Sequence, residues 1–292
     1  MRMFDPHIHM TSRTTDDYRA MAAAGIAAIV EPAFWVGQPR THVGTFEDYF
    51  LSLLGWERFR ASQFGIRHFC TLAMNPKEAN RADLAEGVLA LLPRYLEKDG
   101  VVAVGEIGYD DMTEQEDRVF RRQIELAMDH ELPILIHTPH RDKKRGTERT
   151  IAVVKEMGIA PERVLVDHNN EETLSLTLDS GCWAGHSIYP DTKMDEARMV
   201  KLVERYGSER IIVNSAADWG VSDPLKVPKT VAAMRDAGIG EEAIETIVWH
   251  NPATFFAQSG RLEGIEVRSA IDQRELWEGN SVLRGQAPLV EG

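Results

Sequence analysis

Two histidines spaced two residues apart near the start of the chain give the first indication of chemistry. His7 and His9 follow a short apolar run, in the stretch Met-Phe-Asp-Pro-His-Ile-His-Met. On a strand, residues i and i+2 point to the same face, so the two imidazoles project together from its end. Imidazole is the commonest protein ligand for a metal. The pair therefore predicts half of a metal site, with two solvated histidines as the alternative.

A regular alternation of strands and helices must position these histidines. Most strand-like runs are continuously apolar, which is typical of parallel strands buried on both faces. We predict strands at 2–4, 27–30, 67–72, 101–104, 133–136, 164–166, 181–184 and 210–213. Helical periodicity follows them at 15–24, 46–64, 80–98, 114–130, 147–156, 171–178, 195–206 and 226–236. Thr113 and Glu116 resemble a capping box at the start of one of these helices.

About eight strand–helix units in 292 residues predict an α/β fold, a TIM-type (β/α)8 barrel. The competing doubly wound sheet normally carries a glycine-rich phosphate loop after its first strand. Here that position reads Asp-Pro-His-Ile-His, so we favour the barrel. We expect the barrel to span 1–260. Residues 261–292 then form a C-terminal extension that packs on the barrel or serves as an oligomer arm.

Polar side chains leave most of the predicted strands at the same end, where the active site of such a barrel lies. In chain order the candidates are His7, His9, Glu31, Glu106, His137, His168, His186 and Asp218. Each of them alone could simply bond within its own loop. Histidines from four separate strands, together with carboxylates, are hard to explain by packing, because buried polar groups need partners. A shared metal would supply one partner for many of them.

Imidazoles and carboxylates without thiolates suit catalytic zinc, manganese or similar ions. Five or six such ligands exceed the needs of one tetrahedral ion. A carboxylate can bridge two ions about 3.5–4 Å apart, the arrangement used in phosphoester hydrolysis. Glu106, from a middle strand, is the expected bridge. We therefore predict one or two divalent ions per chain, zinc first, with manganese or magnesium as alternatives.

Several segments, in order over most of 1–260, resemble the TatD-like branch of the metal-dependent amidohydrolase superfamily. Residues 5–9 are similar to the family's opening D-x-H-x-H, and 104–110 to its GEIGLD segment. Residues 120–127, followed by 132–137, resemble the helix and strand that deliver the next metal histidine. Residues 251–256 resemble the closing helix. The resemblance implies one metal held by His7, His9, Glu106 and Asp218, and a second held by Glu106, His137 and His168.

The resemblance also implies that Asp218 acts as the base that orients or deprotonates the attacking hydroxide. The chain departs from the family at three places. Asp218 lies further beyond strand eight than expected, and the family's His-x-Arg after strand five is stretched to His137 through Arg141. His186 stands where a small residue is more usual. We expect His140 or Arg141 to bind an anionic substrate group and His186 to protonate a leaving group, with solvated loop residues as the alternative.

Composition narrows the class of partner. The formal charge of −13 argues against non-specific binding to nucleic acid or anionic membrane, although a metal could still support nuclease chemistry. Cys70 and Cys182 lie in apolar settings and are predicted to be buried free thiols, which indicates a reducing, cytoplasmic compartment. The sequence shows no transmembrane-length apolar run and no signal peptide. The sequence leaves open whether the chain forms a homo-oligomer.

Together these patterns predict a cytoplasmic hydrolase in which a metal-activated hydroxide attacks a phosphoester or a related small-molecule ester. One alternative is lactone or amide hydrolysis, which the aromatic stretch Phe34-Trp35 favours. The other is a non-catalytic metal-binding scaffold, which would tolerate the loss of Asp218 or of one metal.

Overall fold

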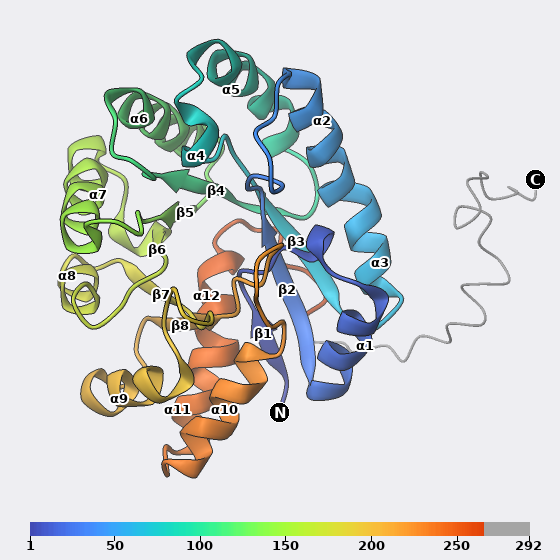
Figure 1. Cartoon of the computed structure of the whole chain (residues 1–292), viewed down its shortest axis with the longest axis vertical. Coiled ribbons are helices and arrows are strands. Elements are labelled where there is room, and N and C mark those ends of the chain that lie inside the picture. The colour runs from blue at the N-terminus through green and yellow to red at the C-terminus, as the bar shows by residue number, and fades with distance from the viewer. Residues whose placement is uncertain (266–292) are drawn as a thin grey trace, which may run out of the picture.

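The computed structural model describes residues 1–265 (Figure 1). Eight strands form one sheet in chain order, and each pairs in parallel with the next. They are β1 (Met3–Asp5), β2 (Ile26–Pro32), β3 (Arg67–Leu72), β4 (Val101–Gly108), β5 (Ile134–His137), β6 (Val164–Val166), β7 (Trp183–Ser187) and β8 (Ile211–Asn214). The predicted TIM-type (β/α)8 fold is confirmed.

The two ends of the sheet order meet through the segments that follow β1 and β8. The amide of His9 donates to the carbonyl of Ala217, and the amide of Ala216 donates to that of His7, both at 2.8 Å. These bonds lie beyond the carboxyl ends of the strands. They therefore tie the segment carrying the two early histidines to the segment carrying Asp218.

Helices surround the strands (Figure 1). They are α1 (Thr15–Ala24), α2 (Val43–Leu51), α3 (Arg58–Ser62), α4 (Pro76–Ala79), α5 (Ala82–Leu96), α6 (Glu114–Asp129), α7 (Lys143–Met157), α8 (Leu174–Asp179), α9 (Glu196–Tyr206), α10 (Lys226–Asp236), α11 (Glu241–Glu245) and α12 (Asn251–Ala257). Shorter pieces are η1 (Met10–Ser12), η2 (Ser52–Glu57), η3 (Pro161–Arg163) and η4 (Thr246–His250). Within residues 1–265, no helix combines the length and apolar character needed to cross a membrane.

The predicted helices correspond to the observed ones with two informative differences. The helix expected at 46–64 is α2, the π-helical η2 and α3 in succession, and it begins earlier because the His42 ring accepts the amide of Gly44. The helix expected at 147–156 begins at Lys143, within a basic run that resembles a loop. The side chain of Thr113 accepts the amide of Glu116 as predicted, and the Glu116 carboxylate instead accepts amides from 110–112.

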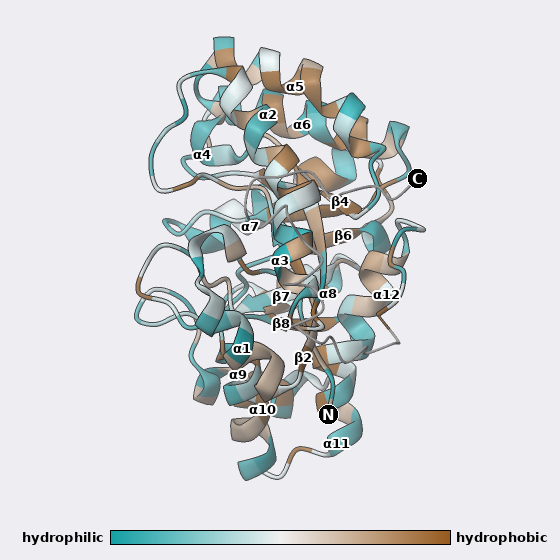
Figure 2. Cartoon of the chain, turned by 90° about the vertical axis from the view of Figure 1, so that its right-hand side faces the viewer, coloured by the Kyte–Doolittle hydropathy of each residue, from teal (hydrophilic) through white to brown (hydrophobic). Residues whose placement is uncertain are grey.

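Apolar side chains fill the barrel and close its amino-terminal end. Phe4 lies 6.3 Å from Trp249 and 6.1 Å from Phe256, measured between ring centroids. The strands are brown in the hydropathy view and the outer faces of the helices are mixed (Figure 2). The polar groups are left to gather at the other, carboxyl end. Of the predicted C-terminal extension, 261–265 are described and Ile265 is buried against this core, while 266–292 lie outside the described residues.

Candidate metal centre and its cavity

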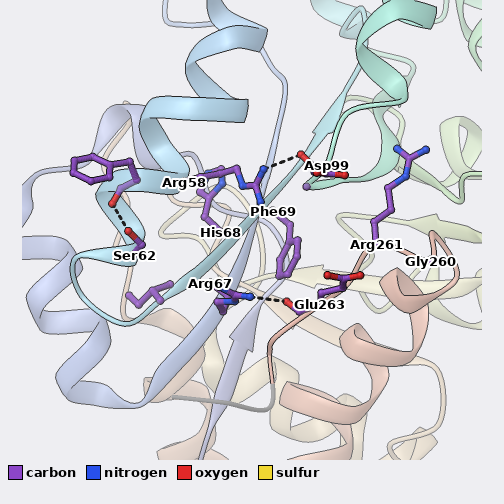
Figure 3. Close-up of a pocket in the computed structure, with 12 residues that line it drawn as sticks. Arg58, Ser62, Arg67, His68, Phe69, Asp99, Gly260, Arg261 and Glu263 are labelled. Atoms are coloured by element: carbon purple, nitrogen blue, oxygen red, sulfur yellow. Dashed lines mark hydrogen bonds between the residues drawn. The ribbon is translucent and has the colours of Figure 1, made fainter. Parts of the chain in front are cut away.

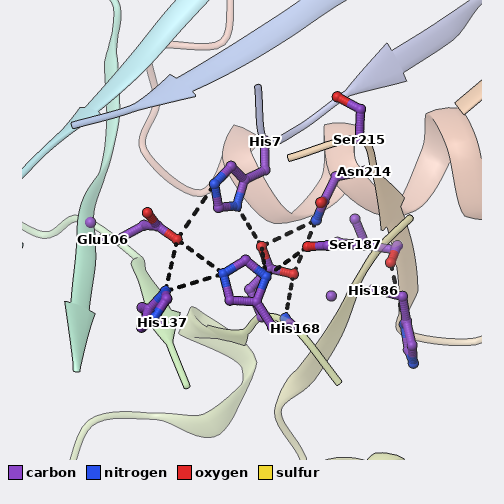
Figure 4. Close-up of polar contacts among 12 residues, drawn as sticks. His7, Glu106, His137, His168, His186, Ser187, Asn214 and Ser215 are labelled. Atoms are coloured by element: carbon purple, nitrogen blue, oxygen red, sulfur yellow. Dashed lines mark hydrogen bonds and ion pairs between the residues drawn. The ribbon is translucent and has the colours of Figure 1, made fainter. Parts of the chain in front are cut away.

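Three imidazoles surround one carboxylate oxygen at the carboxyl ends of the strands (Figure 4). Oε1 of Glu106 lies 3.4 Å from Nε2 of His7, 3.4 Å from Nε2 of His168 and 3.5 Å from Nδ1 of His137. Nε2 of His9 lies 3.2 Å from Nε2 of His7. All five side chains are buried. The structure thus brings together five of the six predicted ligands.

The chemistry of this donor set fits a divalent cation. Oε1 of Glu106 is fully buried yet has no well-formed hydrogen bond. Burial would raise the pKa of Glu106, but the charge of His7 and the close approach of His137 and His168 lower it well below its usual value. Here an ionised carboxylate is surrounded by imidazole rings whose nitrogen atoms face it. A bound metal ion would satisfy all of these groups. His7, Glu106 and His168 would hold the ion, with His9 and His137 at its flanks.

A second carboxylate orients the imidazole of His7. Oδ2 of Asp167 lies 2.5 Å from Nδ1 of His7, which leaves Nε2 to face Glu106. The amide of Asn214 donates to both oxygens of Asp167, at 3.0 and 3.1 Å. Metal-ligating histidines commonly bond a carboxylate through their other nitrogen in this way, which fixes the tautomer. Burial would raise the pKa of Asp167, but the neighbouring His168 and His7 hold it far below its usual value.

His168 has a comparable partner on the neighbouring strand. Its Nδ1 lies 2.6 Å from Oγ of Ser187, so Nε2 is the nitrogen that faces Glu106. Burial and the ammonium group of Lys193 hold the pKa of His168 well below its usual value. Burial also lowers the pKa of His9, to about 4. Both rings are therefore neutral at physiological pH, which is the form that binds a metal.

Asp167, Asn214 and Ser187 were not among the predicted site residues, yet strand alternation identifies them. Side chains two apart on a strand share a face. The barrel-filling Leu165 and Ile212 each stand two residues before a site residue, namely Asp167 and Asn214. The same alternation on β7 points Ser187 into the barrel, so its neighbour His186 must point outward.

The remaining predicted residues occupy different places. Asp218 lines the cavity, but it does not join the cluster around Glu106, and its Oδ1 accepts the Tyr189 hydroxyl and the Gly220 amide, both at 2.8 Å. His186 is fully buried on the outer side of β7, with Nδ1 3.4 Å from the carbonyl of Ile212 (Figure 4). That position does not bring His186 to the cavity as expected for protonation of a leaving group.

Three more candidates follow strand ends, but their side chains lie in different surroundings. His140 lines the cavity, whereas Arg141 is exposed and is not part of the lining. Glu31 faces the helices, where it accepts the amide of Thr11 at 2.8 Å and bonds His68 at 2.9 Å. Glu31 thus anchors the segment just after His9 rather than entering the cluster.

The cluster lies in a cavity of about 660 Å³ whose walls differ from one another. Phe34, Trp35 and Trp219 provide aromatic surface, and Lys77 and Lys193 provide ammonium groups. His140 adds an imidazole whose pKa is lowered by burial to about 3. A second cavity of about 590 Å³ lies near the amino ends of β3 and β4 (Figure 3). There Arg58 donates to the carbonyl of Asp99 at 2.9 Å and Arg67 to that of Glu263 at 3.2 Å.

The family model described as TatD related DNase matches residues 4–257. The chain belongs to the TatD family. An uncharacterised metal-dependent hydrolase of Methanocaldococcus jannaschii is 28% identical over 257 residues, covering 87% of this chain and 99% of that protein. A solved TatD-like protein of Archaeoglobus fulgidus is 27% identical, with a TM-score of 0.73 over 87% of this chain and 99% of that one. The TatD-family chain is thus an enzyme of the metal-dependent hydrolase type.

Two further relatives connect the TatD-family chain with the wider superfamily. An aryldialkylphosphatase of Saccharolobus solfataricus is 25% identical over 204 residues, covering 60% of this chain and 62% of that protein. The phosphotriesterase homology protein of Escherichia coli is 13% identical with a TM-score of 0.64, over 87% of this chain and 98% of that one, which shows a common fold.

Proposed function

We propose that this enzyme hydrolyses phosphoesters of small molecules with the aid of divalent metal held at Glu106. The observation that carries the proposal is the buried, unbonded Oε1 of Glu106 among the imidazoles of His7, His137 and His168. The aryldialkylphosphatase relative, by its name, acts on a phosphorus ester. When bound, the metal lowers the pKa of a water molecule toward neutrality and polarises the scissile group.

Asp218 is the proposed acceptor of the proton that the attacking water loses. Its Oδ1 is already held by the Tyr189 hydroxyl and the Gly220 amide, whereas no donor within residues 1–265 lies at hydrogen-bond distance from Oδ2. A carboxylate fixed through one oxygen and open at the other can take up a proton without turning. Its place on the cavity wall gives it access to the bound substrate.

We further propose that metal is held at two positions that share Glu106. His9 and His7 approach each other on one side, and His137 and His168 approach each other at 3.2 Å on the other. One carboxylate between two histidine pairs suits a bridging ligand. Zinc fits the imidazole-rich set, and manganese is the second candidate.

Lactone or amide hydrolysis is the second candidate function, because Phe34, Trp35 and Trp219 line the cavity and suit an apolar substrate. The test is to strip the protein with a chelator, reload it with zinc or manganese, and assay 4-nitrophenyl phosphate, a γ-lactone and an N-acyl amide. We expect metal-dependent release of 4-nitrophenol, lost in Glu106→Gln. Turnover of the lactone or amide alone would replace the proposed function with the second candidate.

A further inference from the structure

Lys193 places a primary ammonium group at the metal cluster. It stands on the connection between β7 and α9, where Met194 donates to the carbonyl of Ser187 at 3.2 Å and Tyr189 to that of Met194 at 3.0 Å. These bonds close a short loop, and its residues Tyr189, Thr192 and Lys193 line the cavity. The Lys193 side chain lines the cavity, and its Nζ lies 3.3 Å from Nδ1 of His168.

In the part of the chain that the structure describes, this ammonium forms no ion pair. It lies 5.4 Å from the centre of the Tyr189 ring, and Glu106, Asp167 and Asp218 attract it only from beyond ion-pair distance. Within residues 1–265, no carboxylate lies within 4.0 Å of Nζ of Lys193, and the contact with His168 is its one polar contact within hydrogen-bond distance. Nδ1 of His168 faces Oγ of Ser187 and must carry the proton when Nε2 faces a metal, so it cannot accept from Lys193. A cation drawn from water without a partner is unfavourable. A ligand that brings negative charge would supply the partner.

Aromatic side chains lie at the other end of the histidine row. His7 is in ring contact with His9 at 5.0 Å on one side and with His168 at 5.3 Å on the other. His9 is flanked by Phe34 at 5.8 Å and Trp219 at 6.0 Å, and His168 is the ring that Lys193 approaches. The cavity therefore has a cationic end at His168 and an apolar end at His9, whose Phe34 ring extends to His137 at 5.4 Å.

We propose that Lys193 makes this enzyme select phosphate monoesters of small aromatic or apolar alcohols. The ammonium group binds the non-bridging oxygens, while the alcohol portion lies against Phe34 and Trp219. A water oxygen forms a bond to phosphorus, the bond from phosphorus to the alcohol oxygen breaks, and a proton passes to that oxygen, which yields inorganic phosphate and the free alcohol. This inference rests on the proposed function and adds the charge and shape of the substrate.

The charge preference is tested with three esters that share one leaving group: 4-nitrophenyl phosphate, bis(4-nitrophenyl) phosphate and diethyl 4-nitrophenyl phosphate. We expect metal-loaded wild type to prefer the monoester. In Lys193→Met, kcat/KM for the monoester should fall roughly 10- to 100-fold, the usual scale for a charged hydrogen bond. The neutral triester should change less than about threefold, because it offers Lys193 no anionic oxygen. Lys201→Met, an exposed lysine on α9, is the matched control.

Equal losses on all three esters, or no loss on the monoester, would overturn the role of Lys193 while leaving the proposed function intact. Absence of turnover of every phosphorus ester by the metal-loaded wild type would instead overturn the proposed function. The apolar end is tested with benzyl and methyl phosphate, whose leaving alcohols have similar basicity. The proposal requires a higher kcat/KM for the benzyl ester, and a preference that shrinks in Trp219→Ala. Equal rates for the two esters would refute the apolar end.

Discussion

Two cavities of this barrel, one at each end of the strands, have similar size and different chemistry. At the carboxyl ends of the strands, about 660 Å³ contains buried imidazoles and a carboxylate whose inner oxygen lacks a hydrogen-bond partner. At the amino ends, about 590 Å³ is lined by Arg58, Arg67 and Arg261, each of which donates to backbone carbonyls. The comparison teaches that charged residues in a hollow do not mark a site by themselves. The carboxyl-end cavity differs because several buried ionisable groups converge there on one unbonded carboxylate oxygen, whereas the amino-end cavity contains the isolated unbonded Nδ1 of His68.

The fold explains why the two ends differ. Side chains of Phe4, Trp249 and Phe256 pack together below the barrel, so the amino-terminal cavity lies beside an apolar closure. At the other end the strands run out and their last inward side chains are polar. Residues there belong to connections that can vary without loss of the barrel.

The largest expected effect comes from removing the charge at the centre of the carboxyl-end cavity. Glu106→Gln should abolish measurable hydrolysis and weaken zinc binding, because a neutral amide bridges cations poorly. Isothermal titration with zinc and the assay with 4-nitrophenyl phosphate measure the two effects. Glu263→Gln, a carboxylate lining the amino-end cavity, is the matched control and should match wild type. Full activity in Glu106→Gln would remove the distinction between the cavities.

Asp218→Asn should lower kcat by roughly 10²–10⁴-fold, the usual contribution of a positioned acid or base. Its Oδ1 contacts are to donors, which an amide oxygen can still accept, so the loop should keep its geometry. Metal content should stay close to that of wild type, since Asp218 lies outside the cluster around Glu106. The comparable change in the other cavity, Asp99→Asn, should leave kcat unchanged. Near wild-type turnover by Asp218→Asn would assign the proton transfer elsewhere.

Asp167→Asn should cost about 10- to 100-fold in metal affinity or activity, the range found for partners that orient ligating histidines. An amide at this position still reaches Nδ1 of His7 but no longer favours one tautomer through its charge. Competition with a zinc-binding dye measures the affinity. Unchanged affinity in this variant would show that His7 needs no carboxylate to orient it.

Much of this site follows from the sequence, and the part that does not has a physical cause. The order of histidines along the strands predicts His7, His9, His137 and His168 because all leave strands at one end. The face of the sheet to which each side chain points is harder to predict, since a shift of one residue turns the side chain to the opposite face. On β7 this places Ser187 in the barrel and His186 against the helices.

Irregular backbone prevented the prediction of two further features of the site from the sequence. Register shifts between Val104 and Ile107 on β4, so counting from the strand start does not by itself give the direction of Glu106. Lys193 lies on a turn with no helical or strand periodicity, and its approach to His168 depends on tertiary contacts. Strand patterns fix the barrel and its ligands, whereas loop geometry fixes the residues that meet a substrate.

The smallest effect is expected in the amino-end cavity. Arg58→Ala removes a hydrogen bond to the carbonyl of Asp99 and should lower the free energy of unfolding by about 0.5–1.5 kcal/mol. It should leave kcat/KM unchanged. Thermal unfolding and the 4-nitrophenyl phosphate assay measure both quantities. A large kinetic defect with wild-type stability would mean that this second cavity takes part in the reaction.

The central claim is that the imidazoles around Glu106 hold the metal on which hydrolysis depends. Its most direct test is elemental analysis by plasma mass spectrometry of wild type and of a His7→Ala, His168→Ala double variant, both dialysed against the same zinc buffer. Circular dichroism establishes that the variant keeps its fold. We predict one to two equivalents of metal in wild type and near-zero content in the folded variant. Equal metal content in the two proteins would contradict the account.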